Sequence, residues 1–129
     1  MSYSLNFEPR KNFIYITVAG DNNLETVRNY LSEVSDICNH YQCSNVLIVE
    51  NLLGPSLDTL EIFTLVSDRS KQAAESIGRI AYVDVNPEHD KKAMEFAETV
   101  AVNRGLTIRL FDTVEAAEEW LVSYADRED

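Results

Sequence analysis

The feature that most constrains this fold is the run Val46-Leu47-Ile48-Val49, four aliphatic residues with no polar position between them. A strand covered on one face alternates apolar and polar residues, whereas a strand of a parallel sheet is covered on both faces and is apolar throughout. We therefore predict that this run is the central strand of a sheet covered on both sides. It is far shorter than the ~20 residues that cross a bilayer.

The segments on either side of this run predict the rest of the secondary structure. Alternating apolar and polar residues, bounded by turn-forming residues, predict strands at 4–8, 13–18, 79–85 and 106–111. Apolar residues spaced by three and four positions, together with capping residues, predict helices at 24–41, from Ser56 or Asp58 to about 77, at 86–103, and from 112 to about 124.

The order of these elements predicts the fold class. After an opening antiparallel hairpin, strands alternate with helices, giving ββαβαβαβα. The connection rules then favour an α/β fold whose five-stranded sheet is mostly parallel, with an antiparallel first strand and four helices. At 129 residues, without linker or repeat, the chain is expected to form a single domain over residues 1–129.

Three helix ends carry local signals. Asn22 is expected to cap the first helix together with Glu25. Gly78 is expected to end the second helix in a left-handed conformation. The third helix is expected to begin at 86–88, where Asn, Pro and Glu each suit a helix start.

Charge and cysteine content exclude several classes of function. The chain has 11 basic and 22 acidic residues, a formal net charge of −11, which opposes binding to nucleic acids and to anionic membranes but not to a neutral membrane surface. Peripheral membrane contact therefore stays open. The two cysteines are too few for a disulfide scaffold, and the first residues lack an apolar signal core, so the sequence predicts a cytoplasmic protein with reduced thiols.

Two short clusters carry chemically active side chains. Cys38, His40 and Cys43 are types that bind zinc, but no fourth ligand lies nearby and Cys38 belongs to the apolar stripe of its helix, which favours packing. His89 stands between two acidic residues and permits an enzyme hypothesis, although acidic residues at a helix start are usually solvated. No nucleophile elbow or phosphate-binding loop is present, so no catalytic residue, metal or cofactor is predicted.

The second helix is more apolar than one buried stripe requires. Its apolar residues in the first half occupy more than one side and are Leu57, Leu60, Ile62, Phe63, Leu65 and Val66. Either this surface is buried between the sheet and another helix, or part of it meets a second subunit or lines an apolar ligand pocket. In the last case Arg69 and Lys71 could hold an anionic headgroup.

Four segments resemble one family when taken in order: 16–20, a strand leading through glycine to a helix; 46–50, a strand before a loop and long helix; 80–85, a strand; and 109–121, a strand ending in Phe before an Ala-rich helix with Trp and Leu. Together they resemble the SpoIIAA-like branch of the STAS superfamily, the fold of anti-sigma-factor antagonists, which is similar in organisation to the lipid-binding SEC14 (CRAL-TRIO) group. The resemblance implies a domain that recognises a partner protein or a small molecule.

One regulatory feature of the antagonists is not matched. They are phosphorylated at the serine of an Asp-Ser pair that begins the helix after the third strand, whereas residues 50–58 here contain no such pair. Ser56 is the one hydroxyl at that place and is the phosphoacceptor candidate, although a simple helix cap is the favoured interpretation of this residue.

The leading hypothesis is a non-enzymatic module that binds a partner protein, as a homodimer, through residues 52–56 and the second helix. Its surface comprises Leu53, Ser56, Leu57, Leu60, Phe63, Arg69 and Lys71. The alternative is a carrier or sensor of a lipid-like molecule, with Leu57, Leu60 and Phe63 as pocket walls.

Overall fold

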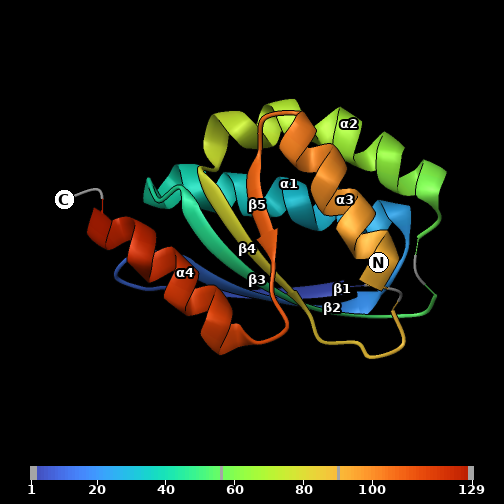
Figure 1. Cartoon of the computed structure of the whole chain (residues 1–129), viewed down its shortest axis with the longest axis horizontal. Coiled ribbons are helices and arrows are strands. Elements are labelled where there is room, and N and C mark those ends of the chain that lie inside the picture. Colours follow the sequence, from blue (N-terminus) through green and yellow to red (C-terminus); the bar gives the residue numbers. More distant parts are fainter. Residues whose placement is uncertain (1–2, 56, 90, 128–129) are drawn as a thin grey trace.

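The structure, a computed structural model, describes residues 3–55, 57–89 and 91–127, with the side chains of 69–76 and 124–127 left out (Figure 1). The elements follow the predicted order and are β1 (Tyr3–Pro9), β2 (Ile14–Asp21), α1 (Leu24–Tyr41), β3 (Asn45–Leu53), α2 (Thr59–Ser76), β4 (Arg79–Asp84), α3 (Lys91–Asn103), β5 (Thr107–Leu110) and α4 (Val114–Arg127).

The five strands form one sheet in the order β1-β2-β3-β4-β5, with β1 antiparallel to β2 and the remaining pairs parallel. This confirms the predicted fold class and the central place of β3. Because the strand order never reverses and crossovers are right-handed, the three connecting helices must lie on the same face. Figure 1 shows α1, α2 and α3 together on one side of the sheet and α4 alone on the other.

The sheet therefore separates two apolar cores. Alternate residues of β3 enter each of them: Val46 and Ile48 pack under α1 and α2, whereas Leu47 packs against α4. All three are 1% exposed or less, as the aliphatic run predicted. On the α4 side the helix contributes Ala117 and Leu121, both completely buried.

Two predicted helix ends are wrong, each for a different reason. Asn23, not Asn22, caps α1 by accepting a hydrogen bond from the amide of Thr26 at 2.8 Å, which leaves Asn22 free to bond the β3–α2 loop. Gly78 does not take a positive φ. An added Cβ would lie 3.1 Å from Oγ of Ser44, so a larger residue at position 78 would crowd the side chain of Ser44.

The starts of α2 and α3 also differ in part from the sequence pattern. Of the two candidates for the start of α2, Asp58 does cap it, because its carboxylate accepts from the amide of Glu61 at 2.8 Å. The helix α3 begins at Lys91, later than predicted, because the side chain of Asn86 accepts from the amide of Glu88 and holds the preceding residues in a turn.

Two further observations bear on the sequence analysis. Cys38 is 2% exposed within the core, and burial raises the pKa of its thiol to about 12, which agrees with the packing interpretation. Among the described residues, no helix has the length and apolar character that spanning a membrane requires.

Candidate functional site

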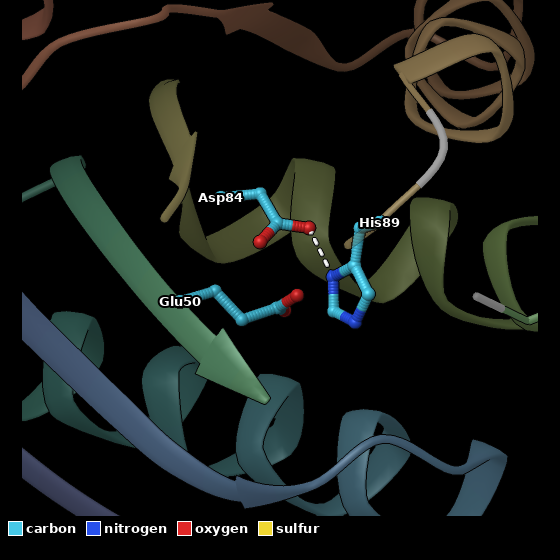
Figure 2. Close-up of side chains that lie close together, drawn as sticks. All are labelled: Glu50, Asp84 and His89. Atoms are coloured by element: carbon cyan, nitrogen blue, oxygen red, sulfur yellow. Dashed lines mark hydrogen bonds and ion pairs between the residues drawn. The ribbon is translucent and has the colours of Figure 1, made fainter. Parts of the chain in front are cut away.

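Two carboxyl groups meet where the central strands end. Glu50 of β3 and Asp84 of β4 are register partners in the parallel ladder, and each continues the alternate positions that face α1, α2 and α3. Parallel register therefore places the two acidic side chains next to each other on the same face. Figure 2 shows Glu50 directed toward the ring of His89, which follows β4.

Glu50 is buried, with 3% of its surface exposed, and its partners are tyrosines. The hydroxyl of Tyr30 on α1 donates to Oε2 of Glu50, and the hydroxyl of Tyr82 on β4 also bonds this carboxyl. Burial raises the pKa of Glu50 from 4.5 to about 7, although both tyrosine hydrogen bonds oppose the shift by favouring the carboxylate. Burial likewise raises the pKa of both tyrosines, so they remain hydroxyl donors.

His89 joins Asp84 to the loop between β3 and α2. Its side chain is 4% exposed, with Nδ1 2.6 Å from Oδ2 of Asp84 and Nε2 3.0 Å from the carbonyl oxygen of Gly54. Nδ1 thus faces a carboxylate and Nε2 faces a backbone carbonyl, so the ring bridges β4 and the loop that follows β3. The amide nitrogens of Asn22 and Asn86 lie 3.5 and 3.4 Å from Nε2 and complete its surroundings.

The same neighbours hold the backbone of residues 52–55, the last two residues of β3 and the two that follow, which are together called the β3–α2 loop below. The side-chain amide of Asn86 donates to the carbonyl of residue 52 at 2.7 Å, and the backbone amide of Asn22 donates to that of residue 53 at 2.7 Å. His89 contacts the carbonyl of residue 54, and the side chain of Asn22 donates to that of residue 55 at 2.8 Å. Four consecutive carbonyls are therefore fixed by groups from the two adjacent loops.

Beneath α2 lies a cavity of about 150 Å³, which opens partly to solvent. Its walls are apolar side chains from the sheet and from α1, α2 and α3, including Ile48, Leu65 and Met94. At one end the walls include Tyr30, Glu50, Tyr82 and His89. The cavity is thus an apolar space with a few hydrogen-bonding groups at one end, the usual composition of a small-molecule site.

The polar end has some features of a metal site. One ligand atom from each of Glu50, Asp84 and His89 lies within 4.8 Å of the other two, and three such ligands with a water could hold a cation such as zinc. In this geometry, however, His89 Nδ1 bonds Asp84 and Glu50 receives tyrosine hydroxyls, so hydrogen bonds between protein groups account for the arrangement.

The structure places the surface residues predicted from sequence in two different settings. Leu57 lines the cavity, whereas Leu53, Leu60 and Phe63 are 63, 73 and 44% exposed on the outside of the loop and of α2. The guanidinium of Arg104 lies 5.1 Å from the ring of Phe63 and covers part of it. Ser56 and the side chains of Arg69 and Lys71 lie outside the described residues.

Glu50, Asp84 and the two tyrosines were not singled out from the sequence, although one signal was available. Glu50 directly follows the aliphatic run of β3, at a position whose parity matches Val46 and Ile48, so a strand covered on both faces must bury it. Its partner Tyr30 lies on the preceding helix, 20 residues earlier in the chain, and no local pattern links the two. His89 was noticed, but with Glu88 and Asp90 as neighbours rather than Asp84.

Comparison with solved structures supports the SpoIIAA-like STAS fold. The chain is similar to an anti-sigma factor antagonist from Mycobacterium paratuberculosis, with a TM-score of 0.63 and 11% identity over 93% of this chain and 94% of that one. It is also similar to an uncharacterised DUF3478-family protein with a SpoIIAA-like fold from Shewanella loihica PV-4, with a TM-score of 0.57 and 13% identity over 93 and 94% of the two chains.

At sequence level, no family model and no curated protein matches the chain. The structural likenesses, at 11 and 13% identity, establish the fold alone.

Proposed function

We propose that this protein is a cytoplasmic regulatory module that performs no chemistry itself and binds a partner protein through the β3–α2 loop and the first half of α2. The observation that carries the proposal is the exposure of Leu60 and Phe63, two large apolar side chains three positions apart on one side of α2. An apolar surface that the chain leaves uncovered is typical of a binding site.

The neighbouring loop supports the same surface. Leu53 is exposed on a loop whose backbone carbonyls are held by Asn22, Asn86 and His89, so its side chain is presented from a fixed backbone. Such preorganisation lowers the entropy lost on binding. One of the structurally similar proteins is an anti-sigma factor antagonist, which is consistent with a regulatory module.

Charge indicates what the partner surface looks like. The net charge is −11, and the exposed Asp58 and the half-buried Glu61 lie near Leu60 in the chain. We therefore expect an apolar patch bordered by lysine or arginine on the partner, because opposite charges around an apolar centre favour correct association. Homodimerisation through α2 is part of the proposal, since the same apolar side chains are available to a second copy.

A photo-crosslinking amino acid at position 60 tests this surface in cells, with the same amino acid at exposed Val122 of α4 as the control. A single crosslinked partner protein or a crosslinked second copy, specific to position 60, is the expected result. Native mass spectrometry then shows whether the 14.6 kDa chain is a dimer and whether Leu60→Ser with Phe63→Ser makes it monomeric. Equal crosslinking at both positions, with a monomer throughout, would contradict the proposal.

A second candidate function is favoured by the cavity: the protein carries or senses a small, mostly apolar molecule. A cavity of about 150 Å³ has the size that holds benzene in another protein, so a whole lipid tail would not fit inside it in this shape. We expect a compact ligand or the end of a longer one. Native mass spectrometry of gently purified protein should show a mass increment that denaturation removes; if repeated preparations carry none and small apolar probes do not bind, this candidate is excluded.

A further inference from the structure

The charges around the cavity select among possible ligands. Among the described residues that line it, Glu50 and Glu98 are acidic, His89 is the one other ionisable side chain besides tyrosine, and no lysine or arginine is present. Asp84 lies directly behind His89. A ligand with a carboxylate or phosphate would therefore enter an apolar space around which three carboxyl groups outnumber a single imidazole, and burial would strengthen the resulting repulsion.

Glu50 has capacity for another donor. Its carboxyl accepts from Tyr30 and Tyr82, but a carboxylate offers about four lone-pair sites. No lysine or arginine is among the groups that shift its pKa; the one basic group that lowers this pKa is His89, whose ring is bonded to Asp84. A buried carboxylate whose one basic neighbour is paired with a second carboxylate is incompletely compensated, so a cation brought by a ligand would relieve the cost of its burial.

We propose that the cavity binds a small apolar amine, whose body fills the apolar walls and whose ammonium group pairs with the carboxyl group of Glu50. This rests on the second candidate function, ligand binding in the cavity. The net charge of −11 attracts such a cation from a distance and repels fatty acids and other apolar anions.

The size of the cavity limits the amine to about one ring or a short branched chain within the walls. The ammonium can donate to Glu50 while the tyrosine hydroxyls remain in place, because each of these groups donates and the carboxylate accepts all of them. The pKa of about 7 keeps Glu50 close to ionisation at neutral pH, so pairing with a cation converts it to the carboxylate at modest cost.

Four ligands with the same ring test the proposal on the unaltered protein: toluene, benzyl alcohol, benzylamine and benzoate. Their affinities are measured at pH 7.5 by calorimetry. NMR shifts of the methyl groups of Ala93 and Ala97, which line the cavity, show whether each ligand binds there. Benzylamine is expected to bind at least tenfold more tightly than toluene or benzyl alcohol, and benzoate most weakly.

Two isosteric variants locate the charge. Glu50→Gln should abolish the preference for benzylamine and leave toluene binding within about threefold, whereas Glu98→Gln, the matched control at the cavity wall, should keep the preference. Equal or better binding of toluene, benzyl alcohol or benzoate by the unaltered protein overturns the amine assignment while leaving ligand binding intact. If no ring binds and the alanine methyls do not shift, both the assignment and the underlying function fail.

Discussion

Replacing Glu50 by glutamine should change how the stability of the protein depends on pH. In the folded state burial raises the pKa of Glu50 from 4.5 to about 7, so between these values the folded protein holds a proton that the unfolded chain has released. The contribution of Glu50 to the stability of the folded state is therefore most favourable below pH 4.5. This contribution is lost as the pH rises through about 7. Glutamine at position 50 removes this dependence because it does not ionise.

The size of the effect follows from the pKa difference. From 4.5 to about 7, at 1.36 kcal/mol per pKa unit, Glu50 costs the folded state about 3 kcal/mol once it is fully ionised. The isoelectric point near 4.5 limits solubility in the acidic range, so measurements are best made from pH 5.5 to 8. Between pH 5.5 and 8 the free energy of unfolding should fall by about 2 kcal/mol because of Glu50.

Urea denaturation followed by the fluorescence of Trp120, the single tryptophan, measures the free energy of unfolding. The difference between the Glu50→Gln variant and the unaltered protein should rise by about 2 kcal/mol in favour of the variant from pH 5.5 to 8. Tyr30→Phe should steepen the pH dependence instead, since the lost hydroxyl favours the carboxylate. A difference that is constant with pH, or that falls, refutes the account of Glu50 as a buried carboxyl near its ionisation point.

Two further substitutions test the contact of His89 with the β3–α2 loop and the apolar core beneath α4. His89→Ala should free the carbonyl of Gly54 and raise the exchange rate of the Asn22 amide, which bonds the same loop, by about tenfold; unchanged exchange would show that the ring does not hold the loop. Leu121→Ala should lower the free energy of unfolding by about 2–5 kcal/mol, because Leu121 of α4 is completely buried between that helix and the sheet. Val122→Ala is its exposed neighbour and should cost less than about 1 kcal/mol, so equal losses would contradict the assignment of the α4 core.

The sequence was sufficient for the fold because its strongest signals are local. The aliphatic run at 46–49 and the alternation of strands with helices predict the central strand and the mostly parallel sheet without any knowledge of distant contacts. The helix caps were less predictable, since neighbouring polar residues such as Asn22 and Asn23 compete for the same role and tertiary contacts decide between them.

The polar end of the cavity was missed for a different physical reason. Glu50 and Asp84 become neighbours only through the register of two parallel strands, and Tyr30 reaches them from a helix on the covering layer. Such groups have no common spacing along the chain. The exposed side chains of α2 had been noticed because an excess of apolar residues is visible locally, but which of them face outward depends on how α2 packs.

The way the β3–α2 loop is fastened has a consequence for sequence change over evolutionary time. All the fastening contacts at 52–55 end on backbone carbonyls, which every residue type supplies, while the fastening groups Asn22, Asn86 and His89 stand in other loops. The side chains of residues 53 and 55 can therefore diversify without loosening it, whereas Leu52 is completely buried in the core and Gly54 has a φ of 110°, which favours glycine. The loop is in this respect a natural place for a library of variants, in which specificity can be selected while the scaffold stays constant.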